Sequence, residues 1–129
     1  MVQQPTQRQL RVGEEIRRVL ARALSEGRVV VPGLKSSGLM ITEVQIAPDL
    51  SFAHVYARAI GSDTAEQVAL LNAHKGAFRK IIGRSVMLRI VPDIVFNPDL
   101  RLEQAAHMAD LLNNPVVRAD IDKHAKKHH

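Results

Sequence analysis

The side chains best suited to chemistry in this sequence are cations, and they form two groups. The Gly76 cluster surrounds a glycine, and its members are His74, Lys75, Gly76, Arg79, Lys80 and Arg84. The arginine row lies near the N-terminus, and its members are Arg8, Arg11, Arg18 and Arg22. Each Lys or Arg that neutralises a phosphate releases a condensed counterion, so both groups predict binding to a polyanion, with nucleic acid the first candidate.

Both groups also have a simpler interpretation as ordinary solvated surface. Glu14 and Glu15 would then neutralise part of the arginine row, Arg79 would pair with a carboxylate, and His74 would be a surface histidine. A helix that begins after Gly76 favours the binding interpretation, because its N-terminal amides and the positive end of its dipole would also meet a phosphate.

The overall composition favours a nucleic-acid partner over other classes. The 129 residues carry a formal net charge of +5, and only 3% of them are aromatic, with no Trp. Few aromatic side chains mean few platforms for stacked bases, so we expect contacts with phosphates and RNA shape instead of base-specific recognition. A membrane surface would require a basic amphipathic helix bearing Trp or Phe, and we expect no membrane partner.

Other features limit location and covalent chemistry. No apolar run approaches the roughly 18 to 20 residues of a membrane-spanning helix, and residues 1–9 lack the apolar segment of a secretory signal. The chain has no cysteine, which excludes disulfides and thiolate chemistry and suits a reducing compartment. We therefore expect a soluble, cytoplasmic, monomeric protein.

No arrangement of residues predicts catalysis. The sequence has no Gly-x-Ser-x-Gly, no P-loop and no His-Glu-x-x-His. His54 and His107 are expected to be structural or exposed, while Asp49 and Asp99 fit a turn and a strand end. We predict no catalytic residue, cofactor, metal or small-molecule substrate. The Lys- and His-rich residues 123–129 could bind metal in vitro, contact RNA or be the remnant of a purification tag.

The elements that must position the cations begin with a helix over residues 6–26. Thr6 and Gln9 form a capping-box pattern at its start, and Gly27 is placed to end it. On the helical wheel the arginine row falls within an arc of about 80° beside an apolar face. That face consists of Val12, Ile16, Val19, Leu20, Ala23 and Leu24.

A loop and a β-hairpin are expected next. Residues 28–38 have the composition of a mobile loop with a short extended start at 29–31. Strands over 39–47 and 52–60 flank a turn, where Pro48 suits the first central position of type I and Asp49 can bond the backbone two residues on. The residues expected to share a face are Met40, Thr42, Val44 and Ile46 in the first strand, and Ala53, Val55, Ala57 and Ala59 in the second.

The second half of the chain predicts two helices, a strand and a last helix. Asp63 and Glu66 form another capping-box pattern, which begins a helix towards Ala73. Gly76 predicts a kink before a short helix that ends at Gly83. A third strand is expected over 86–96, with Pro92 marking an edge or a bulge. A helix over 102–113 follows.

This order of elements predicts an α+β fold, and its first six elements match the type II KH fold, with helices on one face of a three-stranded sheet. KH domains clamp the RNA backbone. We expect one KH-like domain over residues 6–113 that includes a C-terminal helix, a disordered start at 1–5 and a flexible basic tail at 114–129.

An ordered series of motifs resembles the ribosome-binding factor A family over roughly residues 8–112. The family usually carries an Ala-x-Gly kink where this chain has His74-Lys75-Gly76, and Asp-Pro where it has Val31-Pro32. The motifs that match are Arg11-Val12, Glu14-Glu15-Ile16, Thr42-Glu43-Val44, Pro48-Asp49-Leu50, Ala53-x-Val55-Tyr56, Arg79, Gly83, Leu88-Arg89-Ile90-Val91-Pro92 and Phe96-x-x-Asp99.

The resemblance implies a KH-like assembly factor that binds the immature small ribosomal subunit, assists maturation of its ribosomal RNA and matters most in the cold. Two alternatives remain open. One is a generic KH-type RNA chaperone without a ribosomal preference. The other is a small dimerising ligand-binding domain or enzyme, which would need a pocket with convergent polar groups.

Overall fold

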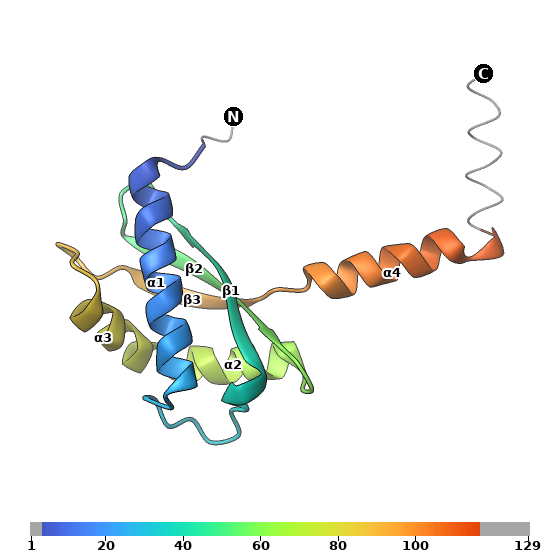
Figure 1. The fold of residues 1–129 in the computed structure, drawn as a ribbon, viewed down its shortest axis with the longest axis horizontal. Coiled ribbons are helices and arrows are strands. Elements are labelled where there is room, and N and C mark those ends of the chain that lie inside the picture. The colour runs from blue at the N-terminus through green and yellow to red at the C-terminus, as the bar shows by residue number, and fades with distance from the viewer. Residues whose placement is uncertain (1–3, 117–129) are drawn as a thin grey trace. The chain divides into compact units, whose positions relative to one another are not determined.

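The computed structural model describes residues 4–116, and the chain divides into two compact units between Asp99 and Leu100. The first unit contains α1 (Gln7–Ser25), the short 3-10 helix η1 (Ser36–Gly38), β1 (Leu39–Ile46), β2 (Phe52–Ala59), α2 (Thr64–Ala73), α3 (Lys75–Ser85) and β3 (Asp93–Pro98). The second contains α4 (Arg101–Asn113). The predicted order of elements is confirmed (Figure 1).

Helix α1 begins with the predicted capping box. The Thr6 hydroxyl accepts a hydrogen bond from the Gln9 amide at 3.2 Å, and the Gln9 side-chain oxygen accepts one from the Thr6 amide at 2.8 Å. Gln9 is itself buried, and its Nε2 donates to the carbonyl of Ile46 at 3.0 Å. The residue that caps α1 therefore also joins this helix to the end of β1. Gly27, with φ of 63°, follows the helix as predicted.

The apolar face of α1 packs on the sheet as predicted, with Ile16 and Leu20 fully buried. Gly13, between the core positions Val12 and Ile16, is where the helix comes closest to β1. A Cβ at Gly13 would lie 2.9 Å from the carbonyl oxygen of Val44. Only glycine permits this close approach without displacing backbone.

The hairpin turn has the predicted chemistry. The Leu50 amide donates to the Ala47 carbonyl at 2.8 Å, which places Pro48 at the first central position. The Asp49 carboxylate accepts from the backbone amide of Ser51 at 3.1 Å and from its hydroxyl at 2.7 Å. These hydrogen bonds lower the pKa of Asp49 below its ordinary value.

The two strands of the hairpin differ in how well their sequence predicts them. In β2 the expected alternation is confirmed, since Ala53, Val55, Ala57 and Ala59 are all buried. In β1 the expected face is wrong in its first half, because Ile41 faces the core and Met40 is exposed.

A β-bulge in β1 is the cause. Ile41 pairs with Ala57 and Glu43 with Tyr56, so Thr42 is the extra residue. One extra residue reverses which side chains face the core. The Thr42 hydroxyl donates to the carboxylate of Asp99 at 2.6 Å, and this buried aspartate stands, as predicted, at the end of β3.

Helices α2 and α3 meet at His74, which ends one helix and begins the other. The predicted break between two helices is present, but it lies at His74 and not at Gly76. Gly76 lies in the first turn of α3, where a Cβ would meet no heavy atom of the described residues within 4 Å. Packing decides the position, because Leu71 before the break and Phe78 after it both reach the core. The predicted end at Gly83 is wrong too: α3 continues to Ser85.

Strand β3 is shorter than predicted and runs parallel to β2, with pairs from Phe52–Asp93 to Ala57–Pro98. Residues 86–92 form a loop instead of the first part of the strand. Two features keep these residues out of the strand. Pro92 has no amide hydrogen to donate, and the Arg79 side chain donates hydrogen bonds to the carbonyls of Val91 and Pro92. The sheet order is β1-β2-β3, which leaves β3 at an edge, as Pro92 indicated.

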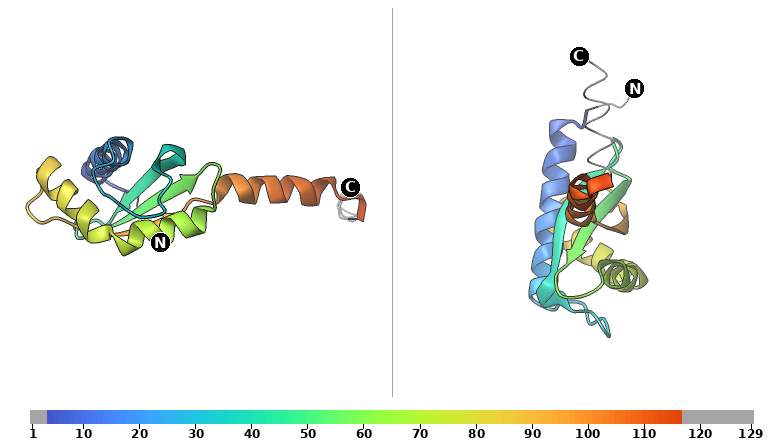
Figure 2. Two further views of the ribbon diagram at one scale, coloured as in Figure 1. Left: turned by 90° about the horizontal axis from the view of Figure 1, so that it is seen from below. Right: turned by 90° about the vertical axis from the view of Figure 1, so that its right-hand side faces the viewer.

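One core joins the helices of the first unit to one face of the sheet. It contains side chains from α1, β1, β2, α2, α3 and β3. The alternating burial along β2 shows that the opposite face of this strand is exposed at Phe52 and His54 and half-buried at Tyr56 and Arg58. Figure 2 gives two further views of α1, α2, α3 and the three strands.

Residues 28–38 form the expected loop, which ends in η1. The buried side chain of Gln67 joins this loop to α2, because it donates a hydrogen bond to the Gly33 carbonyl and accepts one from the Lys35 amide.

The second unit consists, within the described residues, of α4 and the residues that flank it. The helix confirms the expected span of 102–113, and the C-cap at Asn114 precedes Pro115. None of its side chains is buried. Most of the predicted tail at 114–129, from residue 117 onwards and including the Lys- and His-rich segment, lies outside the described residues. The predicted domain over 6–113 stays a prediction.

Candidate nucleic-acid interface

The four members of the arginine row are all exposed on α1. Their expected neutralisation by Glu14 is weak, because Glu14 pairs first with Arg17, which lies outside the row. Arg17 makes two hydrogen bonds to the Glu14 carboxylate, at 2.6 and 2.9 Å, whereas Arg18 of the row lies 3.4 Å away. The hydrogen bonds from Arg17 lower the pKa of Glu14 to about 2. Most of the positive charge of the row therefore remains available.

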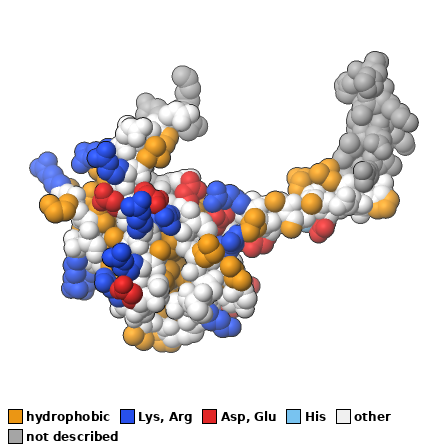
Figure 3. Space-filling view, viewed as in Figure 1, with side chains coloured by type: hydrophobic (Ala, Val, Ile, Leu, Met, Phe, Trp, Pro, Cys, Tyr) orange, Lys and Arg blue, Asp and Glu red, His pale blue; other side chains and the backbone are white. Residues whose placement is uncertain are grey.

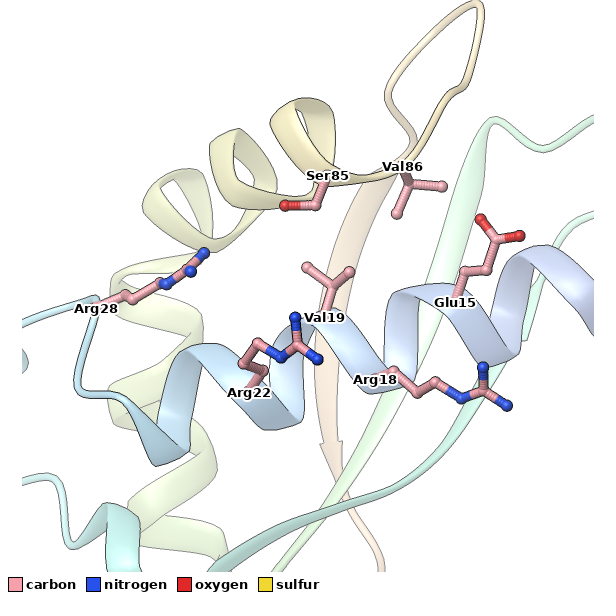
Figure 4. A pocket seen from close by; sticks show the side chains of 7 residues that line it. All are labelled: Glu15, Arg18, Val19, Arg22, Arg28, Ser85 and Val86. Carbon is pink, nitrogen blue, oxygen red and sulfur yellow. The ribbon is translucent and has the colours of Figure 1, made fainter.

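An open hollow of about 380 Å³ lies beside the second half of this row. Figure 4 shows Arg18 and Arg22 on α1, Arg28 on the segment that follows it, and Val19 and Val86 pointing towards each other between α1 and the end of α3. Glu15 and Ser85 complete the lining. Three arginines therefore line one hollow, and guanidinium groups suit an anionic ligand such as a phosphate.

Arg28 is a member of this site that the sequence did not indicate. It lies in the loop after α1, and an ion pair with Glu26 at 2.8 Å holds it. Only the path of the chain after Gly27 brings it beside Arg22. No periodicity could have shown this, because the helix has already ended.

The Gly76 cluster separates into exposed cations and structural residues. Lys75, Lys80 and Arg84 are exposed on α3, and no ion pair within residues 4–116 engages them. His74 is half-buried at the break between α2 and α3, where its Nδ1 lies 3.1 Å from the carbonyl of Leu70. The ring of His74 thus contacts the backbone of the preceding helix turn. Gly76 carries no side chain and places no group of its own at this surface.

Arg79 holds the loop between α3 and β3, which we call the 86–92 loop. Its Nε donates to the Pro92 carbonyl at 3.2 Å and its Nη2 to the Val91 carbonyl at 2.9 Å. Asp93 lies 3.5 Å from the same guanidinium. The guanidinium is therefore largely committed within the protein, as in the simpler interpretation that pairs Arg79 with a carboxylate.

The tertiary structure brings the two groups of cations onto neighbouring helices. Helix α1 packs directly against α3. Figure 3 shows Lys and Arg side chains over α1 and on the side of the molecule where α3 lies, with fewer acidic side chains among them. Residues 8–22 and 75–84 thus contribute to one basic region although more than fifty positions separate them in the sequence.

One further arginine, Arg89, extends this region. Arg8, at the start of α1, and Arg89, in the 86–92 loop, line the same open hollow of about 450 Å³ together with the hairpin turn. Arg84 and Arg89 line another, of about 620 Å³, within the 86–92 loop. Arg89 is not among the cations singled out in the sequence, because the sequence pattern assigns it to a strand and not to an exposed loop.

Aromatic side chains are as few as expected, but their placement is informative. Phe78 and Phe96 are fully buried and meet edge to face, with ring centroids 5.4 Å apart. Phe52 and Tyr56 lie on the outer side of β2, and Phe52 meets the ring of His54 at 5.0 Å. His54 also lies 3.1 Å from the side-chain nitrogen of Asn97, so the expectation of a structural or exposed role fits its surroundings.

The described residues provide no site for catalysis by a metal. Among residues 4–116 no three His, Asp or Glu side chains gather in a way that could hold an ion. His107 lies on the exposed surface of α4. No helix in the described part of the chain is long and apolar enough to cross a membrane.

Comparisons with known proteins agree with the resemblance noted in the sequence. The sequence model of the family described as "Ribosome-binding factor A" matches residues 8–112. The ribosome-binding factor A of Paramagnetospirillum magneticum is 41% identical over 119 residues, which cover 92% of this chain and 84% of that protein. The protein of the same name from Cereibacter sphaeroides is 39% identical over 118 residues, or 91% of this chain and 84% of that one.

Solved structures agree as well. The solution structure of a Thermotoga maritima protein described as a putative ribosome binding factor A is 31% identical with a TM-score of 0.63, over 74% of this chain and 91% of that one. The crystal structure of ribosome-binding factor A from Thermus thermophilus has a TM-score of 0.60 at 21% identity, over 70% of this chain and 94% of that one, a likeness that shows the fold alone. The α+β prediction is thereby confirmed, and the chain belongs to the ribosome-binding factor A family.

Proposed function

We propose that this protein is a non-catalytic assembly factor of the small ribosomal subunit, which binds immature subunits through ribosomal RNA phosphates and assists maturation of that RNA. Membership of the ribosome-binding factor A family supports the ribosomal partner. The observation that carries the proposed mode of binding is the basic region of α1 and α3, where exposed cations lie on two packed helices with few acids among them.

The contacts with RNA phosphates fall to the cations that the protein leaves available. These are Arg8, Arg11, Arg18 and Arg22 on α1, and Lys75, Lys80 and Arg84 on α3. Two other members of the Gly76 cluster also serve the fold, since His74 contacts the backbone at the helix break and Arg79 holds the 86–92 loop. Gly76 lies in the first turn of α3 and adds no side chain to the site. A cytoplasmic location and a monomeric state belong to the same proposal.

Co-sedimentation across a salt series tests this function. The full chain is mixed with immature small subunits, mature small subunits, large subunits and unrelated structured RNA. We expect selective binding to immature small subunits that weakens steeply with salt, because each phosphate contact releases counterions. The variant K75A/K80A/R84A should bind more weakly and with a smaller salt dependence. Wild-type protein that binds none of these particles contradicts the proposal.

A generic RNA chaperone is the second candidate. It is favoured by one observation, that the exposed groups on α1 and α3 are largely cations, which can bind the phosphates of any RNA. Competition separates the two candidates. If unrelated structured RNA displaces the protein from immature subunits at equal phosphate concentration, the general chaperone is correct. An enzymatic pocket is not supported, since the hollows are open and lined largely by arginine and apolar residues.

A further inference from the structure

The 86–92 loop exposes two apolar side chains that nothing in the described part of the chain covers. Met87 is 99% exposed and Ile90 70%. Figure 1 shows this loop extending away from α3 and the sheet. Arg84 and Arg89 lie on either side of Met87 in the sequence and are also exposed. The result is an apolar tip flanked by two cations.

The base of the loop is held firmly, so the exposure of its tip is built into the fold. Arg79 binds the carbonyls of Val91 and Pro92, and Pro92 is fully buried. Leu88 and Val91 pack partly against the core, while Met87 and Ile90, one position before each of them, do not. The backbone is thus anchored on both sides of Ile90.

Close packing on α3 adds to this anchoring. A Cβ at Gly83 would lie 3.0 Å from Cγ2 of Val91, so Val91 occupies the space that a side chain at position 83 would need. Val86, at the start of the loop, is buried as well. Both ends of the loop are therefore fixed on the core, and the tip projects from a rigid base.

The charge around the tip favours an anionic partner. Residues 83–92 contain two arginines and no acidic residue. The hollow of about 620 Å³ is lined by residues 83–89, and Arg84 and Arg89 are its charged members. Arg8 adds a third cation in the adjoining hollow. The one acid there, Asp49, is engaged by the backbone and hydroxyl of Ser51.

We infer that the 86–92 loop is a wedge for RNA: Met87 and Ile90 insert against unstacked bases at a bulge or helix junction, while Arg84 and Arg89 bind the phosphates on either side. Apolar Met and Ile side chains serve as wedges between base steps in other nucleic-acid-binding proteins. Protein recognition of RNA favours bulges and loops, where bases are accessible. This inference rests on the proposed function and adds the structural feature of RNA that the protein prefers.

The test compares two RNAs of equal length, a fully paired duplex and one with a central bulge flanked by 2-aminopurine. Wild-type protein should bind the bulged RNA more tightly and raise its 2-aminopurine fluorescence. The variant M87S/I90S should lose this fluorescence change and about tenfold in affinity for the bulged RNA, the equivalent of one buried apolar side chain. Its binding to the duplex should not change.

Matched variants make the result specific. V30S removes a side chain that is 85% exposed at a distant loop, and it should behave as wild type. M87L/I90V keeps the tip apolar and should retain the fluorescence change. R84A/R89A should weaken binding to both RNAs and reduce the salt dependence by about two counterions. Circular dichroism melting checks that each variant is folded.

The outcomes also separate the wedge from the proposed function. If M87S/I90S binds the bulged RNA and changes its fluorescence as wild type does, the wedge is overturned while subunit binding can stand. If M87S/I90S loses binding to small subunits but not to protein-free bulged RNA, the tip contacts a ribosomal protein and the RNA wedge is wrong. If wild-type protein binds neither subunits nor either RNA, the proposed function fails with it.

Discussion

The side-chain amide of Asn72 pairs with both polar backbone groups of Phe96. Its Nδ2 donates to the Phe96 carbonyl at 2.9 Å, and its Oδ1 accepts from the Phe96 amide at 2.8 Å. Since β3 pairs only with β2 among residues 4–116, Asn72 takes the place that a further strand would occupy at this edge. It also joins the last turn of α2 to β3, two residues before the break that orients α3.

Replacing Asn72 should therefore destabilise the fold. N72A leaves both groups of Phe96 without their partner, and we expect the free energy of unfolding to fall by about 1–3 kcal/mol. Urea denaturation followed by circular dichroism measures it. Q45A is the control, because exposed Gln45 makes only a 3.4 Å contact with Glu43. Equal stability of N72A and Q45A would show that the pairing with Phe96 adds nothing.

Two glycines should respond in opposite ways to alanine. G13A places a Cβ 2.9 Å from the backbone oxygen of Val44, so α1 must move away from β1, and we expect a loss of about 1–3 kcal/mol. G76A meets no atom within 4 Å and lies in a helix, so a gain of up to about 1 kcal/mol is expected. Thermal unfolding compares the two variants. Destabilisation by G76A would mean that the break between α2 and α3 does require this glycine.

Arg79 and Lys80 are neighbours on α3 that should separate stability from binding. R79A removes two hydrogen bonds to the 86–92 loop, and we expect a loss of about 1–2 kcal/mol with faster amide exchange around Val91. K80A removes an exposed cation and should leave stability unchanged while it weakens binding to immature subunits. Hydrogen exchange and co-sedimentation provide the two measurements. If R79A is as stable as wild type, keeps slow amide exchange around Val91 and yet binds subunits more weakly, Arg79 contacts the RNA.

The ionised Glu14 side chain should stabilise the folded protein near neutral pH, and acid should remove this effect. Hydrogen bonds from Arg17 depress its pKa in the folded state from 4.5 to about 2. A depressed pKa stabilises the folded state above the unfolded value, and this contribution is lost as pH falls from about 4.5 through about 2. E14Q should remove it, whereas E15Q should not. Side-chain NMR titration of Glu14 checks the value, and a midpoint near 4.5 would contradict the pairing. The pair is only partly buried, so salt should weaken it.

Local sequence determined the elements whose signals lie within a few residues. The capping box of Thr6 and Gln9, the alternation along residues 53–59 and the turn chemistry of Asp49 are all present as predicted, because each depends on neighbours in the chain. An ordered set of motifs likewise indicated the family over the range that the comparisons confirm. The two groups of cations were visible for the same reason, since charge is a property of residue type.

Only the tertiary structure decided which residues meet. The bulge at Thr42 reverses the faces of β1, a choice fixed by pairing with β2. The break at His74 follows from burying Leu71 and Phe78 together and not from the glycine nearby. Arg79, an expected RNA contact, also binds the carbonyls of residues 91 and 92, because the fold brings them within its reach. These outcomes depend on contacts between distant segments, whose free energy exceeds the weak local preferences that a single sequence displays.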